Sequence, residues 1–444
     1  MQSENIAAIS TGNVPSGVAV IRISGDSPLS IAEKCFKPSG KTAVKDFTPY
    51  RLYPGEIQAE GFCDHGLCVY FKSPKSFTGE DVVEFQCHGG LAITHGILKK
   101  ILSLGARLAT KGEFTKRAFI NGKLSLASAE GLIEMINGES VSGVRAGYSL
   151  YREKLTRRAE EMQNALTAAL AEIDADMDFP EEDLESLSTE NVRAGLNGVT
   201  KELASLINGY SAGRTLVKGV KVAIVGKPNV GKSSLLNALL NYDKAIVSSV
   251  AGTTRDAVEG RIDINDVPFF FTDTAGIRET SGEIEKIGVE MSKKILESAD
   301  VILFVTAAGE RGEEDEKIYS LVKNKNCVTA VNKIDTVREK HTGADVFVSA
   351  TAKTGIDELK NALYEKAVGK VDLGSEFVCE ERHYAALKKA KEKLDLALSG
   401  LGEIPLELVA MDIKDGWDAL GEITGKTASE EIINEIFSKF CVGK

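Results

Sequence analysis

A glycine-rich stretch in the middle of the chain has the residue types and spacing needed to hold a phosphate chain. Gly226-Lys-Pro-Asn-Val-Gly-Lys-Ser233 fits the pattern G-x-x-x-x-G-K-[ST]; it follows the apolar KVAIV and precedes SSLLNALL. In this context backbone N–H groups and a helix N-terminus bind phosphate oxygens, the lysine reaches the β- and γ-phosphates, and the serine binds magnesium. The predicted phosphate contacts are Asn229, Val230, Gly231, Lys232, Ser233 and Ser234.

Three further motifs accompany the phosphate loop, and one of them indicates that the base is guanine. Residues 252–256 read GTTRD, residues 273–276 read DTAG, and residues 332–335 read NKID, each at the end of a predicted strand or in a loop. The Asp335 carboxylate can accept hydrogen bonds from the guanine N–H groups, a pattern that adenine does not offer. The sequence therefore predicts GTP rather than ATP.

A last loop, VSATAKTG, should complete the guanine site, and it can be aligned in two registers. Either Ser349-Ala350 or Thr351-Ala352-Lys353 takes the place of the usual Ser-Ala-Lys, and the sequence does not choose between them. The further predicted GTP contacts are Ser248, Thr254, Asp273, Thr274, Ala275, Gly276, Asn332, Lys333 and Asp335, with Ser349 and Ala350 in the first register.

The switch motif lacks a residue that would orient the attacking water. Ile277 follows the DTAG sequence, where Ras-like GTPases have glutamine, and an isoleucine side chain cannot bind water. Phosphoryl transfer depends mainly on positioning and charge, so a cation and another water-binding group must take over. Asn229 and the loop 248–254 offer an amide oxygen and backbone carbonyls that suit a potassium-sized cation. The predicted ligands are Asn229, Ser248, Val250 and Thr253 for potassium, and Ser233 and Thr254 for magnesium.

Acidic side chains downstream of the switch are candidates for activating the water. They are Glu279, Glu283 and Glu285. A carboxylate can orient or activate a water, here through a second water. Acids in the first turn of a helix also interact well with its dipole, and the residues alone favour this simpler role for any one of them.

These motifs need a scaffold of alternating strands and helices. Between Lys221 and about Val371, the strands KVAIVG, PFFFTD, DVILFV, CVTAVN and DVFVSA alternate with helical stretches, which predicts a Ras-like P-loop GTPase domain with a mostly parallel sheet. Helical sequence on both sides predicts that this domain is inserted into one discontinuous α-helical domain. A strand-rich α+β domain precedes them, so the fold class is multidomain α/β. The predicted domains are 1–118, 119–216, 217–371 and 372–444.

The composition predicts a cytoplasmic globular protein. A chain of 444 residues is too long for one core, and its net charge of −11 argues against a surface coated with basic groups for non-specific nucleic-acid binding. The N-terminus, MQSENIAAIS, has neither the basic nor the apolar region of a signal peptide, and no apolar run has the length of a membrane span. The cysteines are scattered and match no zinc pattern, which fits a reducing compartment.

Two charged residues interrupt otherwise apolar strands near the N-terminus. Arg22 lies in GVAVIRISG, and Glu84 lies in DVVEFQC. Because charged side chains are seldom buried without a partner, the residues alone favour side chains that point outward or pair with another side chain.

The tail TASEEIINEIFSKFCVGK predicts an amphipathic helix. Thr427-x-x-Glu430 has the pattern of a capping box, and Gly443 suits a helix stop. Cys441 can then be read as a core residue or as a reactive one. A prenylation box fits poorly, because Gly443 is not aliphatic and Lys444 is an unusual last residue.

Together these motifs resemble those of the MnmE (TrmE) family of tRNA modification GTPases. The resemblance rests on GKPNVGKS, AGTTRD, DTAGIRE, EKIG, the N-terminal RISG and SFTGEDVVEFQCHGG, and the terminal FCVGK, and it spans almost the entire chain. It implies that Glu285 is the catalytic glutamate and that potassium binds Asn229. It also implies a homodimer in which two G domains meet across their nucleotides.

The same resemblance implies roles for the N-terminal domain and the tail. The domain would bind a tetrahydrofolate derivative, 5-formyl- or methylene-tetrahydrofolate, and Cys441 would serve the modification chemistry. A carboxylate facing a pair of pterin N–H groups makes a sensible bidentate contact, and cationic side chains suit the glutamyl carboxylates. The implied folate-binding residues are Arg22, Glu84, Lys123 and Lys444.

The implied activity is potassium-dependent GTP hydrolysis coupled to formation of the 5-carboxymethylaminomethyl group on the wobble uridine of tRNA. A flavin-dependent partner of the MnmG (GidA) type, which carries FAD, would join the homodimer in a heterotetramer. The alternative is a ribosome-assembly GTPase switch of the Era/Der kind. That alternative shares the phosphate-loop asparagine but leaves the RISG domain and the cysteine-containing tail unexplained.

Overall fold

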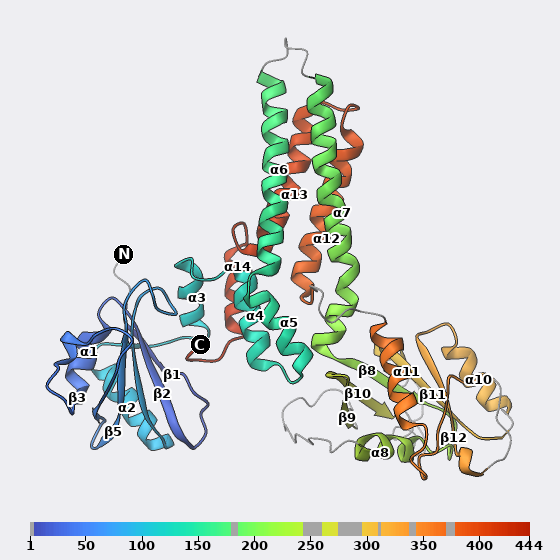
Figure 1. Cartoon of the computed structure of the whole chain (residues 1–444), viewed down its shortest axis with the longest axis horizontal. Helices are drawn as coiled ribbons and strands as arrows, with labels where there is room; N and C mark the ends of the chain where they lie inside the picture. The colour runs from blue at the N-terminus through green and yellow to red at the C-terminus, as the bar shows by residue number, and fades with distance from the viewer. Residues whose placement is uncertain are drawn as a thin grey trace, which may run out of the picture. The chain divides into compact units, whose positions relative to one another are not determined.

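A computed structural model describes residues 4–178, 185–242, 260–273, 295–309, 312–336, 343–369 and 378–444 (Figure 1). The chain forms two compact units, and we describe each by itself. The first comprises Met1–Ile133, Leu150–Thr167 and Trp417–Lys444, and the second comprises Glu134–Ser149 and Ala168–Gly416.

The first unit contains a mixed sheet in the strand order β3-β4-β5-β6-β2-β1-β7. Its strands are β1 (Ile6–Ile9), β2 (Ser16–Gly25), β3 (Phe36–Pro38), β4 (Leu52–Gln58), β5 (Cys63–Phe71), β6 (Asp81–Gly89) and β7 (Arg107–Leu108). Neighbouring strands are antiparallel except β1 and β7, which are parallel. Arg22 of β2 lies opposite Ala8 of β1 on one side and opposite Glu84 of β6 on the other. The strand register therefore brings the two predicted charges side by side.

Different helices cover the two faces of this sheet. The helical segments are α1 (Pro28–Cys35), η1 (Val44–Asp46), α2 (Leu91–Ser103) and α3 (Glu113–Ile120). On one face, Ile21 and Ile23 of β2 share a buried core with Ile97 of α2. On the other, Phe114 of α3 packs against β1. Because side chains alternate along a strand, Arg22 points to the α3 face.

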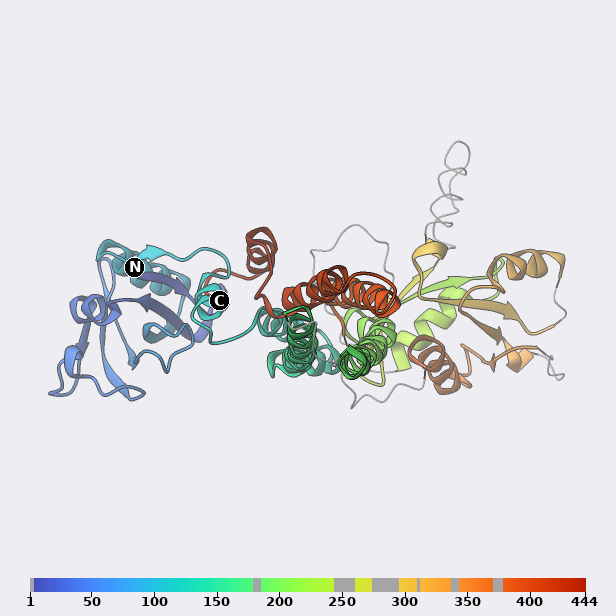
Figure 2. The ribbon, with the colours of Figure 1, turned by 90° about the horizontal axis from the view of Figure 1, so that it is seen from above.

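The second unit contains a sheet in the order β13-β12-β11-β8-β10-β9, parallel except for the antiparallel pair β9 and β10. Its strands are β8 (Val220–Val225), β9 (Gly260–Ile264), β10 (Val267–Asp273), β11 (Val301–Ala307), β12 (Cys327–Asn332) and β13 (Val346–Phe347). Its helical segments with described bounds are α8 (Lys232–Tyr242), α10 (Glu313–Val322), η2 (Ile334–Thr336) and α11 (Ile356–Val368). Helices α10 and α11 lie on opposite sides of the sheet (Figure 2).

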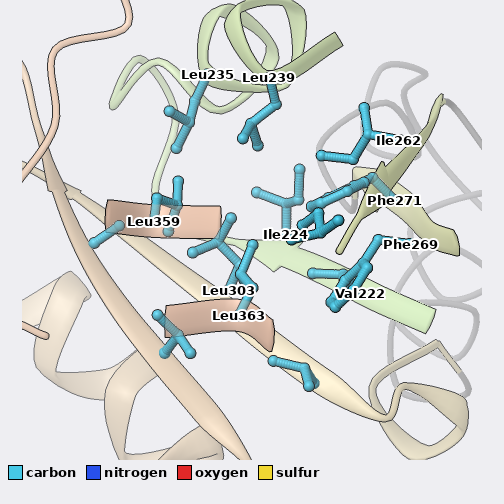
Figure 3. Close-up of a cluster of buried hydrophobic side chains, with 14 of the residues drawn as sticks. Val222, Ile224, Leu235, Leu239, Ile262, Phe269, Phe271, Leu303, Leu359 and Leu363 are labelled. Carbon is cyan, nitrogen blue, oxygen red and sulfur yellow. The ribbon is translucent and has the colours of Figure 1, made fainter. Parts of the chain in front are cut away.

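Near-continuous apolar strands allow this sheet to be buried on both faces. On one face, Leu235 of α8 and Leu359 of α11 meet Ile224 and Leu303 (Figure 3). On the other, Phe304 of β11 packs with residues of α10. The domain is thus doubly wound, as the alternation of strands and helices predicted.

Helices precede and follow the doubly wound domain in the sequence. They are α4 (Leu126–Asn137), α5 (Val141–Tyr151), α6 (Lys154–Asp178) and α7 (Glu185–Lys218) before it, and α12 (Glu381–Gly400), α13 (Leu406–Thr424) and α14 (Glu430–Ser438) after it. Helix α12 lies alongside α7, and the rings of Tyr210 and Tyr384 stack with centroids 4.2 Å apart (Figure 1). The predicted fold class is therefore confirmed. Among the described helices, none combines the length and apolar character needed to cross a membrane.

The start of the last helix differs from the sequence prediction. Ser429 rather than Thr427 is the N-cap of α14, and its hydroxyl accepts a hydrogen bond from the Ile432 N–H. The Thr427 hydroxyl instead donates to the Asp418 carbonyl oxygen, which explains why the capping-box pattern misplaced the helix start. Helix α14 ends at Ser438, so Gly443 is not its stop.

Candidate functional site

The phosphate loop lies between the end of β8 and the start of α8. A Cβ atom at Gly226 would stand 2.2 Å from the Val305 carbonyl oxygen, and one at Gly231 would stand 2.5 Å from Asn332 Nδ2. Both glycines are therefore required because β11 and β12 approach the loop closely. Asn229 has a left-handed backbone with φ of +62° and is exposed.

Side chains at the end of this loop supply an ammonium group, a hydroxyl and a nearby carboxylate. The Lys232 ammonium donates to the carbonyl oxygens of Gly226 at 2.9 Å and Lys227 at 3.1 Å, so it lies folded over the loop. The Ser233 hydroxyl donates to Asp273 Oδ2 at 3.1 Å. A hydroxyl beside a carboxylate is an oxygen donor set that suits Mg²⁺.

The NKID segment is bound directly to the phosphate loop. Asn332 Nδ2 donates to the Val230 carbonyl oxygen at 2.9 Å, and the Lys333 ammonium donates to the Asn229 carbonyl oxygen at 2.8 Å. Asn332 is buried, so this amide serves mainly to hold the two loops together.

Contacts of the last guanine loop distinguish its two registers. The Ser349 hydroxyl donates to Asp335 Oδ1 at 2.6 Å, and the Ala350 N–H donates to Asn332 Oδ1 at 3.1 Å. Lys353 has a left-handed backbone with φ of +54°. The pair Ser349-Ala350 is thus the one that contacts the NKID segment, which favours the first register.

Several predicted site residues lie outside the described residues. They are Ser248, Val250, Thr253, Thr254, Thr274, Ala275, Gly276 and Glu285. They include the predicted catalytic glutamate and most of the potassium ligands, whose roles remain predictions.

In the first unit, Arg22 and Glu84 form an ion pair on the α3 face of the sheet. Arg22 Nε donates to Glu84 Oε1 at 2.7 Å, and the side chains are 19% and 15% exposed. The guanidinium carbon of Arg22 lies 5.4 Å from the ring centroid of Phe77 and 5.6 Å from that of Phe114. A half-buried charged pair beside aromatic rings can bind a flat, polar ring system.

The C-terminal tail reaches the same part of the unit. The Phe114 N–H donates to the Lys444 carbonyl oxygen at 3.2 Å, and the Gly112 N–H donates to that of Cys441 at 3.3 Å. A Cβ atom at Gly443 would stand 2.2 Å from the Ile9 carbonyl oxygen, and Gly443 has φ of +96°. This glycine is needed so that the tail can lie against β1. The Cys441 side chain is exposed.

Lys123 is placed in this region by a backbone contact. Its ammonium donates to the Pro74 carbonyl oxygen at 2.9 Å, and its aliphatic stem lies beside Gly79. The lysine also lines a cleft together with Phe77, the residue that contacts Arg22. The predicted folate residues Arg22, Glu84, Lys123 and Lys444 are thus linked through Phe77 and Phe114.

Sequence reasoning missed the aromatic partners and the ion-pair partner of one buried aspartate. Phe77 stands within the motif SFTGEDVVEFQCHGG, Phe114 lies in the stretch KGEF, and the closeness of both rings to Arg22 in space could not be read from spacing. The Lys227 ammonium contacts Asp315 Oδ2 at 2.7 Å, and Asp315 is 1% exposed. The pair joins the phosphate loop to α10, and an aspartate in the first turn of a helix gave no signal beyond capping.

Comparisons with known families cover nearly the whole chain. A family model described as the GTP-binding protein TrmE N-terminus matches residues 5–123. A second model, described as the MnmE helical domain, matches residues 126–441.

Curated relatives match over the full length. A tRNA modification GTPase MnmE of Acetivibrio thermocellus and one of Thermoanaerobacter pseudethanolicus are each 39% identical to this chain and align with 100% of both chains. A crystal structure of Aquifex aeolicus Era with bound GDP and tetrafluoroaluminate is 34% identical over 40% of this chain and 67% of that chain, with a TM-score of 0.28. A TM-score this low supports no inference from the Era structure.

Proposed function

The chain belongs to the MnmE family of tRNA modification GTPases, and from that premise we propose the finer features of its activity. It is a GTP hydrolase that acts in tRNA modification. We propose that it works as a magnesium- and potassium-dependent homodimer. With a flavin-dependent partner of the MnmG type, it would form the 5-carboxymethylaminomethyl group of the wobble uridine from a tetrahydrofolate one-carbon unit.

GTP binding is supported by contacts among the phosphate loop, the NKID segment and the last guanine loop, which lie at one end of the parallel strands. Asn332 bonds to the phosphate loop, and Ser349 bonds to Asp335. Ligands of open α/β sheets bind outside the carboxyl ends of the strands, where these loops meet. In the proposed complex, Asp335 accepts from the guanine N–H groups and Lys232 exchanges its carbonyl contacts for phosphate oxygens.

Among the described residues, the Ser233 hydroxyl beside the Asp273 carboxylate suits magnesium, and the Asn229 amide oxygen suits potassium. Magnesium would be held by Ser233 and Thr254, with Asp273 nearby, and would neutralise charge on the β- and γ-phosphates. Potassium would be held by Asn229, Ser248, Val250 and Thr253. We assign Glu285 to orienting the attacking water, in place of the glutamine that Ile277 replaces.

For the N-terminal half, the supporting observation is the paired and half-buried Arg22–Glu84 couple beside two aromatic rings. Glu84 would accept from pterin N–H groups, and Lys123 would bind a glutamyl carboxylate. The hydrogen bond from the Phe114 N–H to the Lys444 carbonyl oxygen keeps the tail next to the Arg22–Glu84 pair. Cys441 would serve the modification chemistry at this site. A ribosome-assembly switch of the Era/Der kind is not favoured, because it accounts for neither this pair nor the family matches at residues 5–123 and 126–441.

The folate half is tested by equilibrium binding of 5-formyltetrahydrofolate to the full chain. Wild-type protein should bind, and Arg22→Ala should lose binding while its affinity for GTP stays unchanged. Absence of binding by the wild type would remove the folate assignment.

The hydrolysis half is tested by steady-state GTP turnover in potassium and in sodium. Turnover should need potassium, and Glu285→Ala should bind GTP normally but hydrolyse it poorly. Wild-type turnover in Glu285→Ala would contradict the assignment of that residue.

A further inference from the structure

A cleft of ≈ 530 Å³ in the first unit combines residues from two distant parts of the sequence. Its volume is in the range of small-molecule sites. One wall comes from the region of the folate residues, and the other from the turn between α5 and α6. The lining residues are Ser76, Phe77, Lys123, Leu124, Tyr151, Arg152, Glu153 and Arg157.

The lining combines aromatic side chains with an excess of positive charge. Phe77 and Tyr151 supply aromatic rings, while Lys123, Arg152 and Arg157 are basic and Glu153 is acidic. Three positive charges against one negative charge stand out in a chain whose net charge is −11. This combination fits a ligand with a flat aromatic body and several carboxylates.

The turn that carries the arginines is held in an unusual backbone conformation. Glu153 has φ of +61°, a left-handed value that is costly for a residue other than glycine. Its N–H donates to the Leu150 carbonyl oxygen, and its own carbonyl oxygen accepts from the Arg157 N–H, each at 2.9 Å. Arg157 Nη2 also approaches the Arg152 carbonyl oxygen at 3.4 Å. The turn thus places both arginines on the same cleft.

Phe77 connects this cleft to the Arg22–Glu84 pair. Its ring lines the cleft and lies 5.4 Å from the Arg22 guanidinium carbon. A ligand whose ring system lies at Arg22 can therefore extend past Phe77 towards Lys123 and then towards the arginines. An aromatic amide that continues into glutamate has this order of groups.

We propose that Arg152 and Arg157 bind the carboxylates of a poly-γ-glutamate tail on the reduced folate. This inference rests on the proposed folate site at Arg22 and Glu84. Each added γ-linked glutamate brings one further α-carboxylate, and the guanidinium fork of arginine matches a carboxylate with two hydrogen bonds. Lys123 binds the first glutamate, and the arginines select for chain length beyond it.

The test compares binding of 5-formyltetrahydrofolate monoglutamate and triglutamate to the full chain by titration calorimetry. Wild-type protein should bind the triglutamate about tenfold more tightly, since each exposed ion pair is worth up to about fivefold. The double variant Arg152→Ala/Arg157→Ala should lose this preference but keep its affinity for the monoglutamate. Salt at about 0.5 M should also remove the preference by screening.

Two further variants serve as controls. Lys34→Ala removes one positive charge from α1, on the other face of the sheet, and should leave the preference intact. Glu153→Asn removes the one acidic group of the cleft while tolerating the left-handed backbone, and should strengthen triglutamate binding.

Equal affinities of the wild type for the two ligands, or a preference that survives in the double variant, would overturn the inference. If the double variant loses tRNA binding and keeps its folate preference, the cleft recognises RNA phosphates instead and the inference fails. If the wild type binds neither folate, the folate half of the proposed function fails together with this inference.

Discussion

The nucleotide site of the second unit and the Arg22–Glu84 site of the first differ in how the chain brings their residues together. Asn229, Asn332 and Asp335 lie at or just after the ends of parallel strands of one sheet, and side chains of these segments bond to backbone atoms of their neighbours. Arg22 and Glu84 instead lie 62 positions apart in the sequence and meet through the register of two antiparallel strands.

The difference teaches that the two sites should respond differently to mutation. A site made of contiguous motifs depends on a few local backbone shapes, whereas a site made of scattered side chains depends on every element that positions them. Changes in the G domain should therefore leave folate binding intact. Changes at α3 or the tail should weaken folate binding without affecting GTP.

The largest effect is expected for Asp335→Asn. The variant loses two charge-assisted hydrogen bonds to guanine, each worth about 1.5–3 kcal/mol, so GTP affinity should fall at least about 100-fold. Titration with GTP and with folate checks both halves of the comparison. The prediction would be wrong if Asp335→Asn kept its GTP affinity within a few fold. Loss of folate binding in the same variant would contradict the independence of the two sites.

Lys227→Met tests how much the contact between the phosphate loop and α10 contributes to stability. The change leaves the buried Asp315 carboxylate without its 2.7 Å ammonium partner, which should lower the free energy of unfolding by about 3 kcal/mol. Urea unfolding of the full chain measures the loss. Adding Asp315→Asn to this variant should restore part of the stability, and no recovery would show that Lys227 acts by other contacts.

Gly443→Ala probes the tail. Its Cβ would stand 2.2 Å from the Ile9 carbonyl oxygen at a backbone φ of +96°, so ordering of the tail should weaken by about 2–3 kcal/mol. Folate binding should fall while GTP hydrolysis stays normal. Gly40→Ala is a matched control, because a Cβ there meets no atom within 4 Å. If Gly443→Ala and Gly40→Ala changed folate affinity equally, the tail would not contribute to the folate site.

The smallest effect is expected for Glu113→Gln at the start of α3. Burial alone would raise the pKa of the Glu113 carboxyl, but hydrogen bonds from Arg107, the Thr110 N–H and Arg117 outweigh it and lower the pKa to about 2. Its ionised form therefore stabilises the fold above its ordinary pKa of 4.5. Because Arg107 is 39% exposed, we expect a loss of about 1–2 kcal/mol at neutral pH.

The loss of stability caused by Glu113→Gln should depend on pH. The difference between wild type and Glu113→Gln should be full at neutral pH and shrink as pH falls from 4.5 towards about 2, as the carboxylate takes up its proton. Urea midpoints across this range measure it. A difference that grows on acidification would mean that Glu113 does not act as a paired carboxylate.

The sequence by itself determined the doubly wound domain and the guanine specificity expected of NKID. Each of these depends on residues close together in the chain. It could also be read that Arg22 and Glu84 need partners, because charges within apolar strands are costly.

Only the tertiary structure decided which partners Arg22 and Glu84 have. It paired Arg22 with Glu84, set Phe77 and Phe114 beside Arg22 and placed Gly443 against Ile9. These outcomes depend on strand register and on packing between segments far apart in the chain. Local sequence patterns carry no information about such contacts, because their energies arise only when the distant segments meet.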